Sequence, residues 1–239
     1  MSIFSTSAAA DSLALVGPTG DGCKLIVPIS TQDQPIALPD RVRLPLAFDP
    51  ARLAEDLARF GPADWTDHFV RRNYEGAWSA LPLRAPAGET HPVRMINPDP
   101  TATGFVETGF LDRAPYLREV LAAFRCPLRV ARLMRLSPGS AIKEHEDLDL
   151  DAACGRARLH VPIRTGAGVE FLVNRRAVEM APGSAWYLRL ADPHSVANRG
   201  TEDRVHLVID AVVDDWLLDM LVSAARSGRS ADRGGCSRS

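Results

Sequence analysis

The sequence predicts a mainly β domain with packed helices, arranged as a sandwich or a barrel. Short runs suited to strands crowd the second half of the chain, and turn residues separate them at close spacing. Apolar residues make up 46% of the 239 positions, which is enough for a real core. The runs are LRVARLMRL, RARLHVPIR, GVEFLV, SAWYLRL and RVHLVIDAVV, with turn signals at Ser137-Pro138-Gly139, Gly166-Ala167-Gly168, Pro182-Gly183 and Asn198-Arg199-Gly200.

The first part of the chain combines a loose segment with a helix. Residues 1–40 hold scattered Gly, Pro, Ser and Thr, so we expect this segment to be loosely ordered. The stretch from Asp49 to Gly61 predicts a helix, because Asp49 can cap it, Pro50 fits its first turn and Gly61 ends it.

Further elements follow in order. Residues 74–85 are typical of a strand with its flanking turn, residues 114–124 of a second amphipathic helix, and residues 214–225 of a closing helix. The Gly/Ser/Arg-rich end is expected to be disordered. We therefore expect a loose segment over 1–40, a single domain over 41–225 with its β core at about 126–213, and a disordered tail over 226–239.

Composition excludes several classes of protein. The net charge of −2 and the lack of a basic patch with interleaved aromatics argue against nucleic acid or an anionic membrane as a partner. The four cysteines form no CxxC pair, which argues against a disulfide scaffold and a thiolate zinc site. No apolar run approaches the ~18 residues of a membrane span, and the N-terminus does not resemble a signal peptide. These features predict a cytoplasmic protein.

An acidic run, Glu144 to Asp151, contains one histidine and predicts a metal site. In an extended chain His145 and Asp147 share a face, so that an imidazole and a carboxylate can bind one metal ion. His194 is the best candidate for a third ligand, and two imidazoles with one carboxylate are the ligand set of non-haem Fe(II) oxygenases. The alternative is a solvated acidic turn with a surface histidine.

Two strands each carry a basic pair on one face. On RVHLVIDAVV, Arg204 and His206 lie on the face opposite to a uniformly apolar one, and Arg158 and His160 do the same on RARLHVPIR. Burying a guanidinium without a partner is costly. A small dianion that also binds metal, such as 2-oxoglutarate, fits a lining of this kind. We assign Arg204 to its distal carboxylate and, more loosely, Arg158 and His160 to the same cosubstrate.

The residues that follow resemble a known family. PGSAWYL, PHSVANRG and DRVHLVID occur in this order, and the stretch from about Arg129 to Leu217 is similar to the aspartyl/asparaginyl β-hydroxylase family of Fe(II)/2-oxoglutarate-dependent dioxygenases. The resemblance implies a double-stranded β-helix, also called a jelly roll, with a cupin-like core. It also implies Fe(II), 2-oxoglutarate and O2 as cofactor and cosubstrates.

The same resemblance implies roles for individual residues. His145, Asp147 and His194 would be the metal ligands and catalytic residues, and Arg204 would bind 2-oxoglutarate. Some members of the family lack the carboxylate ligand, so Asp147 aligns this chain with the small-molecule hydroxylases of bacteria. Asp149 lies two residues after Asp147, on the same face of an extended chain, and could replace it as a ligand. Glu146 lies on the opposite face and cannot.

The expected substrate is a free amino acid or a small amino-acid-derived metabolite. The alternatives are an Asp/Asn-type side chain of a peptide or protein, a non-catalytic jelly-roll module that binds a metal or ligand, and a cupin-type enzyme with His160 or His206 on the metal. Nothing in the sequence predicts the oligomeric state. Candidate substrate anchors are Arg84, Arg132 and Arg135, Trp78 and Trp186 could shape the pocket, His206 could support it, and His68 and His91 are expected to have no role.

Overall fold

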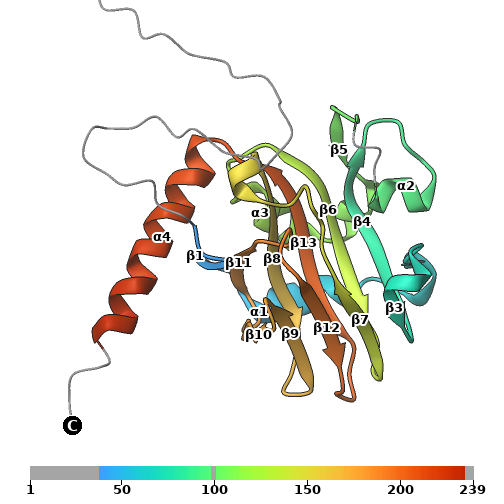
Figure 1. Ribbon diagram of the computed structural model, residues 1–239. Coiled ribbons are helices and arrows are strands. Elements are labelled where there is room, and N and C mark those ends of the chain that lie inside the picture. The colour runs from blue at the N-terminus through green and yellow to red at the C-terminus, as the bar shows by residue number, and fades with distance from the viewer. Residues whose placement is uncertain (1–37, 98–100, 235–239) are drawn as a thin grey trace, which may run out of the picture.

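The computed structural model describes residues 38–97 and 101–234, and within them two antiparallel sheets face each other (Figure 1). The larger sheet has the strand order β1-β11-β8-β13-β6-β4-β2, with β5 paired to β4, and the smaller has the order β10-β9-β12-β7-β3. The predicted fold class, a mainly β jelly roll with packed helices, is confirmed. The strands are β1 (Arg41–Ala47), β2 (Thr66–Asp67), β3 (Tyr74–Glu75), β4 (Trp78–Pro86), β5 (Phe105–Glu107), β6 (Leu128–Leu136), β7 (Ser140–His145), β8 (Arg156–Arg164), β9 (Val169–Val173), β10 (Arg176–Ala177), β11 (Ser184–Leu188), β12 (His194–Asn198) and β13 (Arg204–Val212).

Helices cover one face of the larger sheet. They are α1 (Pro50–Leu57), α3 (Pro115–Ala122) and α4 (Asp215–Gly234). The short helix α2 (Pro92–Ile96) instead packs against β4 and β6, and its Ile96 belongs to the buried cluster between the sheets. Short 3₁₀ turns are η1 (Pro62–Asp64), η2 (Arg71–Asn73), η3 (Gly109–Arg113) and η4 (Ala152–Cys154). Leu53 of α1, Leu117 of α3 and Leu217 of α4 pack with Leu159 of β8 and Leu207 of β13 in one buried cluster. In Figure 1, α4 lies beside β1 at one edge of the molecule, while α2 and β3 lie at the opposite edge.

A second buried cluster lies between the two sheets. It contains Met134 of β6, Val208 of β13, Phe171 of β9 and Val196 of β12. Because successive side chains of a strand point to opposite faces, β6 and β13 contribute to both clusters, whereas β8 gives its apolar side chains to the helix side and Arg158 and His160 to the pocket side. The polar side chains on the inner face therefore project into the space between the sheets.

Local sequence explains the ends of the helices. Asp49 caps α1, where its side chain accepts hydrogen bonds from the backbone N–H groups of Ala51 and Arg52, as the sequence predicted. The buried Asp56 accepts a 2.8 Å bond from the N–H of Leu117 in the first turn of α3. This carboxylate therefore joins the two helices.

The last helix is longer than expected. We expected a disordered tail from residue 226, but α4 continues to Gly234. Residues 226–234 contain three arginines and one alanine, which are good helix formers, after the apolar periodicity has ended. Residues 235–239, like the loose segment over residues 1–37, lie outside the described residues. No helix in the described part of the chain is both long and apolar enough to cross a membrane.

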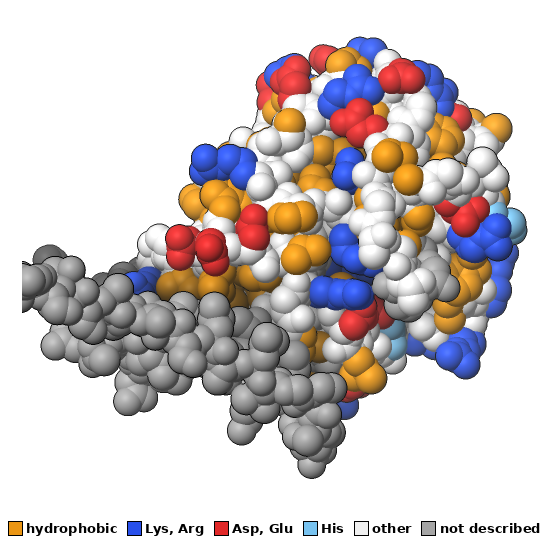
Figure 2. Space-filling view, turned by 90° about the horizontal axis from the view of Figure 1, so that it is seen from above, with side chains coloured by type: hydrophobic (Ala, Val, Ile, Leu, Met, Phe, Trp, Pro, Cys, Tyr) orange, Lys and Arg blue, Asp and Glu red, His pale blue; other side chains and the backbone are white. Residues whose placement is uncertain are grey.

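The surface carries mixed charge. On the face shown in Figure 2, Lys and Arg side chains are interspersed with Asp and Glu. This distribution agrees with the net charge of −2.

Candidate metal centre and its pocket

A cavity of about 350 Å³ lies between the two sheets. Strands β6, β8 and β13 of the larger sheet supply one wall, and β7, β9 and β12 supply the facing wall. The roof comes from segments that precede the core strands. We use the term roof for the pocket residues His68, Phe69, Val70, Asn73, Trp78, Ile96 and Asn97.

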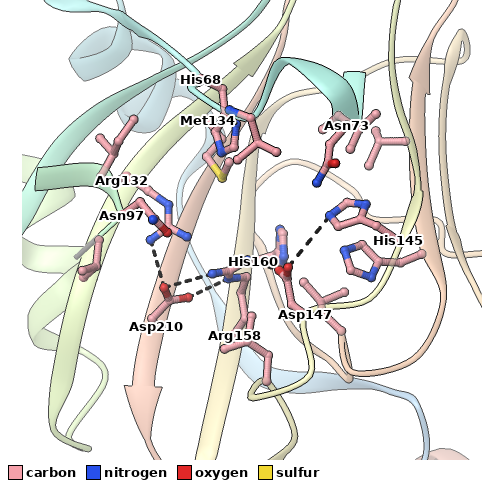
Figure 3. A pocket seen from close by; sticks show the side chains of 18 of the residues that line it. His68, Asn73, Asn97, Arg132, Met134, His145, Asp147, Arg158, His160 and Asp210 are labelled. Atoms are coloured by element: carbon pink, nitrogen blue, oxygen red, sulfur yellow. Dashed lines mark hydrogen bonds and ion pairs between the residues drawn. The ribbon is translucent and has the colours of Figure 1, made fainter. Parts of the chain in front are cut away.

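Sheet register brings the predicted metal ligands together. His194, the first residue of β12, pairs directly with His145, the last residue of β7, and Asp147 follows two residues later. One ligand atom from each of the three side chains lies within 4.8 Å of the others. His145 Nε2 is 4.0 Å from Asp147 Oδ1, and the centres of the two imidazole rings are 4.2 Å apart (Figure 3).

Hydrogen bonds give both imidazoles the tautomer that a metal requires. Nδ1 of His145 lies 2.8 Å from the carbonyl oxygen of Lys143, and Nδ1 of His194 lies 3.0 Å from that of Asp192. A carbonyl only accepts, so each Nδ1 carries the proton and each Nε2 keeps its lone pair. Burial lowers the pKa of His194, which also favours the neutral ring. Two imidazoles and a carboxylate of this kind fit Fe(II).

The rest of the acidic run lies outside the ligand set. Glu144 pairs with Arg175, the exposed Asp149 pairs with Arg156 at 2.9 Å, and Asp151 caps η4. Asp149 therefore has a cationic partner of its own, and the structure groups Asp147 with the two histidines. His160 and His206 are not part of that group, which removes support from the cupin-type alternative.

Four charged side chains form a chain of ion pairs along the inner face of the larger sheet. Arg132 donates to Asp210 at 2.9 Å, Arg158 donates to both oxygens of Asp210 at 2.6 and 3.1 Å, and Arg158 also donates to Asp147 at 2.7 Å (Figure 3). Burial alone would raise the pKa of Asp210, but the two guanidiniums hold it well below its usual range.

These contacts favour a different role for Arg158 from the expected one, which was to bind the cosubstrate. In the structure three of its N–H groups bind protein carboxylates, one of which belongs to the candidate ligand Asp147. Burial would lower the pKa of Arg158, but Asp210 and Asp147 raise it above its ordinary value. Its partner Asp210 was not singled out in the sequence analysis as a site residue.

No carboxylate among the described residues offsets the charge of Arg204 in this way. Its side chain is buried, its Nη2 donates to Nδ1 of His206 at 2.8 Å, and its Nε has no partner. The guanidinium lies 5.6 Å from the centre of the Phe171 ring, and among the described residues no carboxylate pairs with it. Burial lowers its pKa to about 9. An anion from outside the protein would satisfy this group.

Two buried imidazoles accompany Arg204. Both ring nitrogens of His160 and Nε2 of His206 lack hydrogen-bond partners, and the two rings lie 5.7 Å apart in an edge-to-face arrangement. Burial and the neighbouring Arg204 lower the pKa of each ring well below its ordinary value. Neutral imidazoles with unsatisfied polar atoms are unusual in a core and are typical of a site that receives a polar ligand.

The sequence analysis missed His68. We expected no role for it, but its ring stacks on Trp78 in the roof, with centroids 3.6 Å apart and planes 10° from parallel. Burial and then the charges of Arg132 and Arg158 lower its pKa to about 4. The only hint in the sequence is that apolar Phe69 and Val70 follow it, which a polar loop would not need.

Of the candidate substrate anchors, the structure places only Arg132 in the pocket. Arg84 donates to the backbone oxygens of Leu128 and Phe105, and Arg135 donates to Ser79. Of the two tryptophans, Trp78 lines the pocket and Trp186 does not. Asn73, Asn97 and Met134 line the pocket without having been predicted.

Comparisons with known proteins identify the family of the chain. Residues 62–213 match the family described as aspartyl/asparaginyl beta-hydroxylase. The chain is 31% identical to an L-proline cis-4-hydroxylase of Rhizobium meliloti over 166 residues, which are 68% of this chain and 57% of the relative. It is 24% identical to an L-proline cis-3-hydroxylase of a Streptomyces species over 172 residues, which are 71% of this chain and 59% of that relative. The chain thus spans under two thirds of the length of these relatives.

Solved structures with a similar arrangement include two oxygenases. A 2OG-Fe(II) oxygenase family oxidoreductase from Burkholderia pseudomallei is similar over 72% of this chain and 85% of its own, with 19% identity and a TM-score of 0.45. A prolyl-4-hydroxylase from Pseudomonas putida is similar over 73% of this chain and 93% of its own, with 12% identity and a TM-score of 0.45.

Proposed function

Because the chain belongs to the aspartyl/asparaginyl β-hydroxylase family, we propose that it is an Fe(II)- and 2-oxoglutarate-dependent dioxygenase that hydroxylates a free amino acid or a small amino-acid-derived metabolite. One observation carries the proposal. His145, Asp147 and His194 present two unprotonated Nε2 atoms and a carboxylate within 4.8 Å of one another, in the same cavity as a buried arginine that no carboxylate of the described residues neutralises.

The three ligands would hold the iron. When bound, Fe(II) together with 2-oxoglutarate and O2 supplies the oxidising power for C–H hydroxylation. The chain contributes orientation, because the backbone carbonyls of Lys143 and Asp192 fix both imidazole rings.

Arg204 would bind the distal carboxylate of 2-oxoglutarate. A planar guanidinium forms a bidentate bond with a carboxylate, and the partnerless Nε of Arg204 is available for it. His160 stays assigned to the cosubstrate, since both of its ring nitrogens lack partners in the protein. Arg158 is assigned to Asp147 and Asp210 instead.

A small amino acid would occupy the space under the roof. Arg132 lines the pocket and, although it donates to Asp210, would bring positive charge to an α-carboxylate. The stacked pair of His68 and Trp78 offers an apolar surface with a neutral polar edge. A cavity of about 350 Å³ is at the small end of the range for ligand sites, which favours a free amino acid over a peptide. The curated relatives are named as hydroxylases of L-proline, so L-proline is the first substrate to test.

Anaerobic titration followed by turnover tests the proposal. Addition of Fe(II) and 2-oxoglutarate should produce a weak visible charge-transfer band, and a panel of amino acids that includes L-proline should then be tested for succinate release in air. With one amino acid of the panel, we expect succinate to form from 2-oxoglutarate in a 1:1 ratio with the hydroxylated product. His91→Ala is a matched control for His194→Ala, because His91 is exposed at the start of α2 and does not line the pocket. Metal binding with no succinate formed from 2-oxoglutarate, whichever amino acid or peptide is present, would instead indicate a non-catalytic binding module.

A further inference from the structure

We propose that Asp210 is a positioning residue for the metal-binding carboxylate, and that it acts through Arg158 to keep one oxygen of Asp147 available to the metal. This inference rests on the proposed function, in which Asp147 is a ligand. Asp210 itself is not in the cluster of candidate ligands.

Hydrogen bonds fix the Arg158 guanidinium on two sides. Its Nε and Nη2 donate to the two oxygens of Asp210 at 2.6 and 3.1 Å, and its Nη1 donates to Oδ2 of Asp147 at 2.7 Å. Arg158 thus binds only Oδ2 of Asp147, and the other oxygen, Oδ1, lies 4.0 Å from Nε2 of His145. A bond of 2.8 Å from the N–H of Asp147 to the carbonyl of Leu190 holds its backbone in place.

Strand register makes this arrangement rigid. Asp210 and Arg158 are direct partners in the pairing of β13 with β8, and neither is exposed. Arg132, on β6 at the other side of β13, donates a hydrogen bond of 2.9 Å to the same carboxylate. Asp210 is therefore held from both neighbouring strands.

Removing the Asp210 carboxylate would have two effects on the metal site. Arg158 would be free to bind both oxygens of Asp147 in a bidentate pair, which competes directly with a metal for the ligand. The cluster would also lose one negative charge while it keeps the charges of Arg132 and Arg158, and this disfavours a cation nearby. Both effects weaken metal binding without any contact between Asp210 and the ion.

Asp210→Asn tests the inference with Mn(II) alone as the probe. Free Mn(II), counted by electron paramagnetic resonance, gives the dissociation constant without cosubstrate or turnover. We expect the variant to bind Mn(II) about 10- to 100-fold more weakly than the wild type, the range found when partners of a metal ligand are changed. The matched control is Asp56→Asn, which also removes a buried carboxylate but lies between α1 and α3. It should lower the melting temperature and leave the Mn(II) affinity unchanged.

A second pair of variants covers the case in which Asp210→Asn does not fold because it removes the carboxylate that Arg132 and Arg158 share. Arg132→Gln keeps the contact between Asp210 and Arg158, and Arg132→Gln/Asp210→Asn removes it at the same net charge as the wild type. The double variant should bind Mn(II) at least tenfold more weakly than Arg132→Gln.

The outcomes separate this inference from the proposed function. Equal Mn(II) affinity for variants with and without Asp210, in a protein whose wild type binds Mn(II), would overturn the inference alone. A wild type that binds no Mn(II) would overturn the metal centre and the inference with it.

Discussion

Replacement of Arg204 by methionine should affect stability and cosubstrate binding in opposite directions. The change removes the guanidinium and keeps a long flexible side chain. In the absence of ligand Arg204 is a buried cation, 3% exposed, whose pKa burial lowers from 12.5 to about 9. At about 1.4 kcal/mol for each pKa unit, the charged group destabilises the fold by several kcal/mol at neutral pH. We therefore expect the ligand-free variant to be at least as stable as the wild type.

The effect on 2-oxoglutarate should be large. Truncating one partner of a buried, hydrogen-bonded charge pair costs roughly 3–4 kcal/mol, which corresponds to an affinity loss of about 150- to 900-fold. Differential scanning fluorimetry of the ligand-free protein and anaerobic titration of the Fe(II) form with 2-oxoglutarate measure the two effects.

A control variant separates the site from a general loss of positive charge. Arg135→Met changes an arginine of the neighbouring strand β6 that donates to Ser79 outside the pocket, and it should leave cosubstrate affinity within about twofold. The reasoning would be refuted if Arg204→Met bound 2-oxoglutarate within threefold of the wild type. It would also fail if the ligand-free variant melted far below the wild type.

Three further outcomes are expected. His194→Ala should reduce Mn(II) affinity more than 100-fold, and unchanged affinity by paramagnetic resonance would remove this residue from the ligand set. The fold lowers the pKa of His160 below 6.5, its ordinary value in an unfolded chain. The free energy of unfolding should therefore be highest above pH 6.5 and fall as the pH decreases below it, by up to about 1.4 kcal/mol per pH unit. Urea unfolding of the metal-free protein at pH 7.5 and 5.5 should show that the unfolding free energy falls less in His160→Gln than in the wild type. An equal fall in both proteins would count against His160 as a source of this pH dependence. Gly183→Ala should destabilise by about 2–3 kcal/mol, because φ is +77° and a Cβ would overlap the carbonyl of Phe48, whereas Gly139→Ala, at φ +72° in open space, should cost only about 1 kcal/mol. Equal melting temperatures for the two would contradict this explanation.

Alternation along the strands is the part of the fold that the sequence predicted best. The boundaries of β6 and β8 match the predicted runs, and the apolar face of β13 packs against the helices as its period of two required. The helix that follows Asp49 was also predictable, because its cap and its first-turn proline are local signals. Strands β7 and β12 were not predicted, because β7 carries charged residues and β12 is short and lies among turn residues.

Partners far apart in the chain explain what the sequence could not predict for the site. The parity of His145 and Asp147 indicated a shared face, and the register of β12 against β7 then added His194. The contact of Arg158 with Asp210 depends on the pairing of β13 with β8, which no local pattern specifies, so this contact was not predicted. His68 was overlooked for the same reason, since its place depends on stacking against Trp78.

The division of the pocket into core strands and roof has a consequence for protein engineering. The candidate ligands and Arg204 lie on or beside strands of the two packed sheets, whereas Phe69, Asn73 and Asn97 come from connecting segments. Under the proposed function, a mutant library confined to these three positions is expected to change which amino acid is accepted, while the candidate ligands and Arg204 stay unchanged. Substrate selectivity would then be evolved apart from the candidate metal site.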